Sequence, residues 1–132
     1  MSILKVDTIG DTSGSGNVNI QAEGTNTTNL SQGLVKQWVA FDMTDSSIGD
    51  SFNTTTVTDV DDGDFNVIIA NDFANIHYAM TTSGTNSSNG DAFVSMGGVT
   101  PTVTQYRLTA VLSNGSNIDF DQVKSMCAGD LA

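Results

Sequence analysis

The chain has 132 residues, a length that suits one domain, and its 38% hydrophobic residues can form a modest core. Lys and Arg number 4 against 15 Asp and Glu, so the formal net charge is -11 at pH 7. A field of that sign repels phosphate backbones and anionic membrane surfaces. We therefore expect no nucleic-acid partner and no membrane insertion.

Charged residues make up only 14% of the chain, so Asn, Ser, Thr and Gly must cover most of the surface, as in extracellular fibres and lectin-like modules. The single cysteine, Cys127, cannot form an intrachain disulfide and is expected to act as a small buried hydrophobe. The opening residues 1–5 lack the apolar core of a signal peptide, and no stretch reaches the roughly 20 apolar residues of a membrane span. We expect a soluble protein made in a cytoplasm.

The N-terminal part of the chain is sparse in apolar residues. Residues 3–9 alternate with the period of a strand, residues 10–16 form a Gly/Ser-rich loop or linker, and residues 23–31 are polar. We divide the chain near residue 32 into an N-terminal arm, residues 1–32, and a β-rich head domain, residues 33–132. The arm cannot form a core of its own, so we expect it to attach the protein by pairing its backbone with partner chains. The attachment candidates are Leu4, Val6, Ile9, Val18 and Ile20.

The first predicted strand of the domain covers residues 34–41. Apolar side chains alternate onto both of its faces, with Val39 and Phe41 on one and Trp38 on the other. This strand is therefore expected to be central in its sheet or to lie against a second subunit. The oligomer-interface candidates are Leu34, Val35, Trp38, Val39 and Phe41.

Two further strands are predicted at residues 54–60 and 65–70, which are rich in β-branched and apolar side chains. Between them lies Asp61-Asp62-Gly63-Asp64, where Asp-Gly favours a type I′ hairpin turn with positive backbone angles. This is the strongest local signal in the chain.

The C-terminal half continues the strand pattern. Strands are predicted at residues 76–80, 92–96, 106–112 and 118–126, with a Ser/Thr/Asn/Gly loop at 81–90 and a second hairpin signal at Asn114-Gly115. No window shows a sustained apolar stripe of period 3.6, so helix content should be very low. The fold is predicted to be all-β, a small β-sandwich or barrel-like domain with an extended N-terminal arm.

Few residues suggest chemistry. The acidic group Asp59, Asp61, Asp62 and Asp64 lacks the glutamate that closes a calcium loop, and it is predicted to be a solvated turn. His77, the only histidine, is expected to be a packed or surface imidazole. No nucleophile elbow, Cys/His pairing or phosphate-binding loop is apparent. We therefore expect no catalytic residue, no metal and no cofactor.

The aromatic residues lie mostly inside predicted strands, where burial of large rings is the ordinary explanation. Trp38 and Tyr106 are the two for which stacking on a sugar in a receptor site is the alternative.

Two segments resemble a known family. Leu4-Lys5-Val6-Asp7-Thr8-Ile9, followed by a Ser/Gly stretch and Val18-Asn19-Ile20, is similar to the N-terminal segment of fibre-like virion structural proteins of tailed bacteriophages, especially phages of marine cyanobacteria and other marine bacteria. The stretch from Gly33 to Tyr78, ending in Phe73-Ala74-Asn75-Ile76-His77-Tyr78, resembles their head module. Together these segments cover roughly half of the chain.

The resemblance implies a β-rich virion protein, commonly a homotrimer, made in the host cytoplasm and exposed on the particle. The expected function is a short tail or head fibre or knob component, with tail, neck or capsid proteins as partners and a host surface receptor or glycan as a candidate contact. The alternative is a capsid decoration (cement) protein that stabilises the head. A small glycan-degrading domain is the weakest alternative, because an acid pair can be drawn in almost any acidic β protein.

Overall fold

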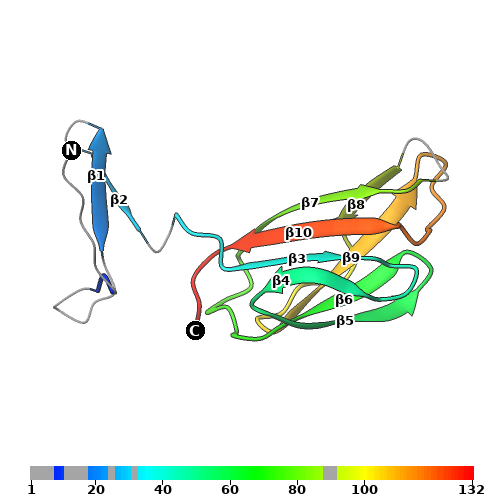
Figure 1. Ribbon diagram of the computed structural model, residues 1–132, viewed down its shortest axis with the longest axis horizontal. Helices are drawn as coiled ribbons and strands as arrows, with labels where there is room; N and C mark the ends of the chain where they lie inside the picture. Colours follow the sequence, from blue (N-terminus) through cyan, green and yellow to red (C-terminus); the bar gives the residue numbers. More distant parts are fainter. Residues whose placement is uncertain (1–7, 11–17, 24–25, 31–32, 88–91) are drawn as a thin grey trace. The chain divides into compact units, whose positions relative to one another are not determined.

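The computed structural model describes residues 8–10, 18–23, 26–30, 33–87 and 92–132 (Figure 1). The chain divides into two units, residues 1–34 and residues 35–132, and each is described here by itself. Within the described ranges the regular structure consists of strands, and nothing helical is long and apolar enough to span a membrane.

The N-terminal unit contains one antiparallel strand pair, β1 (Asn19–Glu23) and β2 (Asn26–Asn29). Ile20 pairs with Thr28, and the Leu30 amide donates to the Val18 carbonyl over 2.7 Å. The polar stretch 23–31, for which no strand was predicted, thus contributes β2. Its two threonines are β-branched and favour an extended backbone.

The C-terminal unit is a sandwich of two four-stranded antiparallel sheets, which confirms the predicted all-β fold (Figure 1). The first sheet has the order β4-β3-β10-β7 and the second the order β5-β6-β9-β8. The strands of the first sheet are β3 (Gln37–Phe41), β4 (Ile48–Phe52), β7 (Ala79–Thr85) and β10 (Gln122–Ala128). Those of the second are β5 (Thr54–Asp61), β6 (Asp64–Ile69), β8 (Ala92–Met96) and β9 (Gln105–Leu112).

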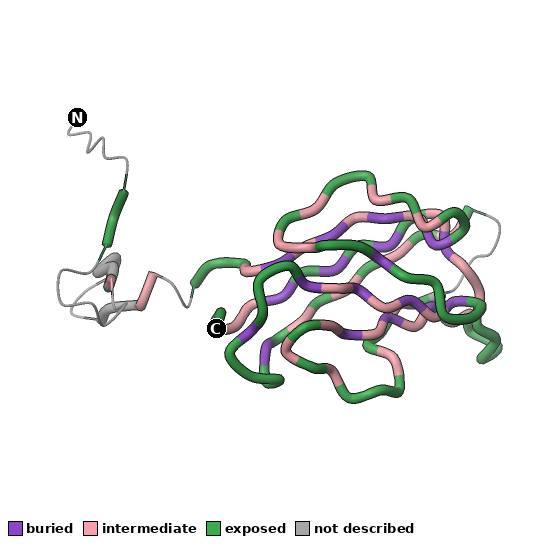
Figure 2. The backbone as a smooth tube through the Cα atoms, turned by 90° about the horizontal axis from the view of Figure 1, so that it is seen from below, coloured by how far each residue is buried: buried purple, intermediate pink, exposed green. Residues whose placement is uncertain are grey.

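The core lies between the two sheets, where buried positions alternate with partly or fully exposed ones along the strands (Figure 2). Phe65, Phe120 and Leu108 are fully buried, and the rings of Phe41 and Phe65 meet with centroids 5.6 Å apart. Cys127 is also buried, as predicted. β3 is a central strand of its sheet, which is one of the two placements expected from its apolar faces.

A sharp corner moves the chain from the first sheet to the second. Asn53 stands between β4 and β5 with a φ of 54°, and its side-chain amide donates to the carbonyls of Lys36 and Asn71 over 2.9 and 3.0 Å. The Asn71 amide donates back to the Asn53 side chain over 2.6 Å. These bonds fix the corner between β4, an edge strand of the first sheet, and β5, an edge strand of the second.

The acidic hairpin joins β5 and β6 as predicted, but the type I′ assignment is wrong. A type I′ turn needs a positive φ at both central residues, here Asp62 and Gly63. Gly63 has a φ of 70°, but Asp62 does not have a positive φ. The strand register also shifts between Asp59 and Asp61, the mark of a bulge. The Asp119 carboxylate accepts the Gly63 amide over 2.8 Å and holds this hairpin from a distant segment.

The predicted boundaries of β7 are wrong. Residues 76–78 precede the strand, and much of the predicted loop at 81–90 is strand. Its residues are small because the two sheets approach each other there. The Thr82 hydroxyl donates to the Val94 carbonyl over 2.6 Å, and a Cβ on Gly84 would lie 2.7 Å from the Phe120 ring.

The second hairpin signal forms a tight turn, and the chain after it pairs back with β9 through one isolated antiparallel bridge, although it joins no two of the named strands in one sheet. Gly115 has a φ of 88°, and its amide donates to the Leu112 carbonyl over 2.9 Å. After this turn the chain crosses to the first sheet, where β10 begins at Gln122 and not at the expected residue 118.

Candidate functional site

The outward face of the first sheet carries a row of apolar side chains. Trp38 pairs with Phe52 on one side and with Met126 on the other, and Met126 pairs with Thr81. Cross-strand partners point to the same face, so these four side chains cross the whole sheet. Phe52 and Met126 are 53% and 47% exposed, and Trp38 is partly buried. We call Phe52, Trp38 and Met126, whose row ends at Thr81 on β7, the apolar row.

A second row of cross-strand neighbours lies on the same face, two residues away along each strand, and it carries side chains of opposite charge. Ala40 pairs with Asp50 on β4 and with Lys124 on β10, and Lys124 pairs with Ser83 on β7. Asp50 and Lys124 are both exposed. Their backbones are two strand spacings apart, about 10 Å, with only the small Ala40 between them. We call Asp50, Ala40, Lys124 and Ser83 the charged row.

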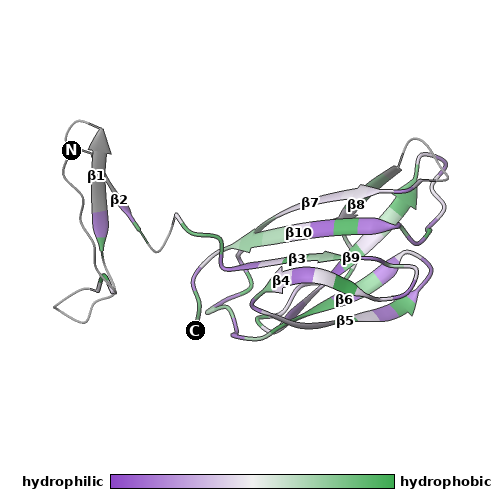
Figure 3. Cartoon of the chain, in the orientation of Figure 1, coloured by the Kyte–Doolittle hydropathy of each residue, from purple (hydrophilic) through white to green (hydrophobic). Residues whose placement is uncertain are grey.

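The polarity of this face changes along β10. Of the β10 residues that alternate onto this face, Gln122 and Lys124 near the start are polar, whereas Met126 and Ala128 near the end are apolar. Figure 3 shows the hydrophobic colouring at the C-terminal end of the strand. Val35, which precedes β3, extends the apolar part and is 43% exposed. The face therefore has an apolar end and a polar end.

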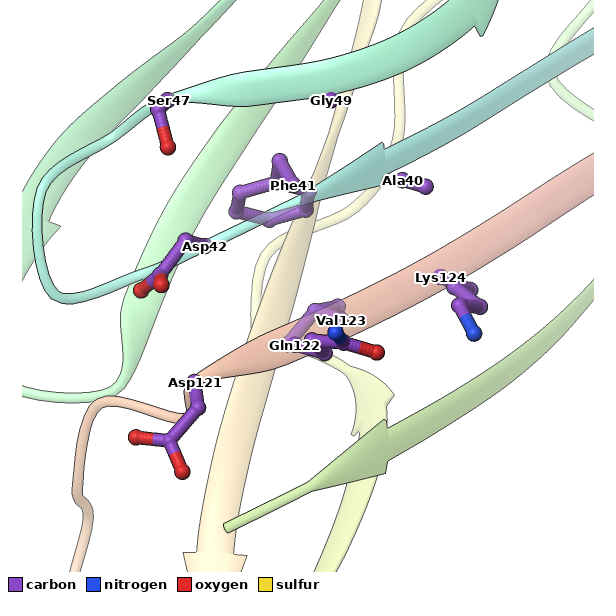
Figure 4. Close-up of a pocket in the computed structure, with 9 residues that line it drawn as sticks. All are labelled: Ala40, Phe41, Asp42, Ser47, Gly49, Asp121, Gln122, Val123 and Lys124. Atoms are coloured by element: carbon purple, nitrogen blue, oxygen red, sulfur yellow. The ribbon is translucent and has the colours of Figure 1, made fainter. Parts of the chain in front are cut away.

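Shallow hollows run along the face. One of about 330 Å³ is lined by Trp38, Ala40, Thr81, Ser83, Lys124 and Met126, among others. Another of about 370 Å³ lies toward the polar end, where it is lined by Asp42 and Ser47 from the β3–β4 connection and by Asp121, which directly precedes β10 (Figure 4). A third of about 210 Å³ includes Val35 and Met126. Residues shared between neighbouring hollows make this a continuous surface.

A buried polar cluster lies beneath the face and joins the two sheets. The Tyr106 hydroxyl donates to Gln37 Oε1 over 2.9 Å and lies 2.7 Å from Ser125 Oγ. Gln37 Nε2 donates in turn to Thr54 Oγ1 over 2.9 Å. The cluster ties β9 of one sheet to β3 and β10 of the other.

The groups in this cluster are neutral over the physiological range. Burial raises the pKa of the Tyr106 hydroxyl, and burial raises the pKa of the neighbouring Cys127 thiol to about 12. A buried thiol with a raised pKa is a poor nucleophile. The cluster is therefore suited to holding strands in place beneath the face.

The outward face of the second sheet is different. The Arg107 guanidinium donates to Asn66 Oδ1 over 3.1 Å, and the Thr109 hydroxyl donates to the Asp64 carboxylate. Phe93 and Val111 form an apolar pair at the β8 edge, but the pairing of β6 with β9 ends at Thr109, so the pair does not continue across the sheet.

The structure places the interface candidates in two settings. Val39 and Phe41 are 1% and 3% exposed, so they belong to the core of their own domain, and the sequence-based assignment of these two residues to an interface is corrected. Leu34 and Val35 are exposed, and Trp38 stands on the outward face. The alternation of β3 was predicted, but not which of its two faces points inward.

The attachment candidates lie in the N-terminal unit. Leu4 and Val6 fall outside the described residues. Ile9 is exposed, Val18 is partly buried, and Ile20 lies in β1, where its backbone pairs with β2. Their role in attachment stays a prediction.

The structure also shows the surroundings of the residues that were considered for sugar stacking, catalysis or metal binding. Tyr106 is 1% exposed, so the sugar-stacking alternative at this residue is wrong, whereas Trp38 is accessible. His77 is exposed, and its backbone amide donates to the Asn75 side chain. Asp59, Asp61 and Asp62 are exposed. In the part of the chain that the structure describes, no group of three or more His, Cys, Asp or Glu side chains could hold a metal ion.

Phe52, Met126, Asp50 and Lys124 were not among the sequence-based candidates. The alternation in residues 122–128 places Lys124 and Met126 on the same side of a strand, and this pattern could have identified the two residues as neighbours on one face. Their meeting with Trp38 and Phe52 depends on pairing between distant segments, which no local pattern encodes.

Comparison of the chain with protein-family models, curated proteins and solved structures finds no match. A binding role can therefore be inferred only from the face itself. Covering it would remove apolar surface from water, worth roughly 25 cal/mol per Å². The arrangement is suited to binding another surface.

Proposed function

We propose that this protein is a virion structural protein of a tailed bacteriophage, a short tail or head fibre or knob component that acts by binding other surfaces. The observation that carries the binding role is the apolar row on the outward face of the first sheet. Contiguous exposed apolar patches on soluble proteins commonly mark sites of interaction. The virion setting is supported by the sequence resemblance described above.

The two-unit organisation suits this role. The β-sandwich supplies a rigid body with one apolar outward face, and the N-terminal unit is a separate element available for attachment. An all-β domain with Asn/Ser/Thr/Gly-rich loops also suits exposure on the outside of a particle. Assembly as a homotrimer belongs to the proposal, since further copies of the chain can cover the apolar face.

Antibody labelling of purified virions, viewed by electron microscopy, tests the proposal. We expect label at the tail or neck. Label distributed over the capsid would favour the decoration-protein alternative and replace the fibre assignment. If mass spectrometry of purified particles finds none of this protein, the virion role is wrong.

A further inference from the structure

We propose that the outward face of β4-β3-β10-β7 is covered by another copy of this chain, with Asp50 of one copy against Lys124 of the next. This inference names the partner of the face on which the proposed function depends. It follows from the order of the charges and apolar groups across the sheet.

The charged row is complementary to itself. Asp50 stands on β4 and Lys124 on β10, and these strands flank β3 on opposite sides. Rotation about an axis parallel to β3 and above the face brings the β4 side of one copy against the β10 side of the next. Each copy then offers its acid to the neighbour's base, and both charges find partners as the face loses water.

The same rotation matches the apolar row. Phe52 on β4 of one copy meets Met126 on β10 of the next, while Trp38 lies near the axis beside its own counterpart. Ala40 is small, so it leaves room for the pair formed by Asp50 and Lys124 on either side of it. One operation therefore satisfies both rows.

The charge of the chain favours a copy in this arrangement over random self-association. Two chains of formal charge -11 repel each other, and the chain has only 4 Lys and Arg residues. One of them, Lys124, stands in the middle of the face. Close approach of two copies is therefore least unfavourable where Lys124 meets an acid.

Exchanging the charges of Asp50 and Lys124 in the purified 132-residue chain tests the pairing. We expect wild-type protein to have a mass of more than one chain by sedimentation equilibrium. Asp50→Lys and Lys124→Asp should each weaken association about tenfold or more, and the double variant should recover it. Asp59→Lys, which makes the same charge change on exposed β5 of the other sheet, should not weaken association. Trp38 is the only tryptophan, so its fluorescence reports covering of the face.

An equal mixture of the two single variants measures the symmetry. In a twofold dimer made of one copy of each variant, both contacts pair a lysine of one copy with an aspartate of the other, so association recovers fully. A ring of three must place two like variants side by side, so recovery is incomplete. Either result supports the pairing.

Two outcomes would overturn the proposal. The first is wild-type protein that stays monomeric from micromolar to near-millimolar concentration, with Trp38 emission unchanged. The second is a double variant that folds, by circular dichroism, but associates no better than the single variants. Both are measured without virions, so they are separate from failure of the virion role. A shift of Trp38 emission on adding glycans to a monomeric wild type would identify a sugar as the occupant instead.

Discussion

The two outward faces of the sandwich are built on the same plan, four antiparallel strands with alternating side chains, yet they differ in how their polar groups are satisfied. On the second sheet Arg107 bonds to Asn66 and Thr109 to Asp64 within the chain. On the first sheet Asp50 and Lys124 stand on either side of Ala40, in the row next to the exposed apolar groups. The Asp50 carboxylate accepts the backbone amide of its neighbour Ser51 over 2.8 Å, and its side chain stays exposed. The second face satisfies these polar groups within the single chain, whereas the first is the face that we propose binds a partner.

The largest expected effect concerns the fold of the second sheet, where one glycine is irreplaceable. In Gly63→Val, the new Cβ would meet the Ala110 carbonyl oxygen at 2.6 Å and the Ile118 amide at 2.7 Å, at a φ of 70°. We expect the free energy of unfolding to fall by about 3 to 5 kcal/mol, measured by urea denaturation.

The hairpin at Gly63 should act without calcium. A chelator is expected to leave the melting temperature of the wild-type protein unchanged. A drop of many degrees would show that the acidic turn binds an ion, and a near-neutral Gly63→Val would contradict the close packing of this hairpin.

Next in size is the effect of Trp38→Lys on association. We expect association through the first face to weaken by roughly 2 to 4 kcal/mol, because a central aromatic anchor is replaced by a charge. Light scattering measures the mass, and circular dichroism checks the fold. Phe93→Lys, the same kind of change at a more exposed aromatic residue of the second sheet, is the control. The two faces would be equivalent if both variants dissociated the protein to the same extent.

A smaller effect is expected for the polar cluster beneath the first face. Tyr106→Phe removes the hydroxyl that serves Gln37 and Ser125 and leaves buried polar atoms without that partner. The free energy of unfolding should fall by about 1 to 3 kcal/mol. The Tyr78 hydroxyl donates to backbone carbonyl oxygens at 3.1 and 3.4 Å. Its removal in Tyr78→Phe should lower the free energy of unfolding by less than Tyr106→Phe does. The reverse order would mean that the cluster does not support the strands.

Alkaline pH should destabilise the fold through the same region. Burial raises the pKa of Cys127 from 9.0 to about 12, so the unfolded chain loses this proton first. The stabilising contribution of the neutral thiol is complete below pH 9 and is lost as the pH rises toward 12, by up to about 1.4 kcal/mol per pH unit. Denaturation curves at pH 8 and pH 10 measure the loss. Cys127→Ala should reduce the difference; an unchanged difference would exclude the thiol as its source.

The smallest effect on stability is expected from removing the arm. Deletion of residues 1–31 should leave the free energy of unfolding of the β unit within about 0.5 kcal/mol, since that unit has its own core. The truncated protein should fail to enter virions, measured by immunoblotting of purified particles. Normal incorporation would move attachment to the β unit and strengthen the decoration-protein alternative.

Much of the fold could be predicted from local patterns. The alternation of β-branched and apolar residues predicted strands that match β5, β6, β8 and β9 closely, and Asp62-Gly63 predicted the hairpin between two of them. Most of β7 was predicted to be a loop, because its Ser, Thr and Gly residues are those that also form loops. Their strand conformation depends on pairing with β10 and on close approach to Val94.

The sequence by itself determined that the protein is all-β and that one strand near Trp38 is apolar on both sides. Only the tertiary structure decided which side is the core. Gln37 is buried because Tyr106 reaches it from the opposite sheet, and Val39 and Phe41 follow it inward. Trp38 is thereby turned outward to meet Phe52 and Met126. A period of two assigns residues to alternate faces, but pairing between distant strands decides which of those faces is covered.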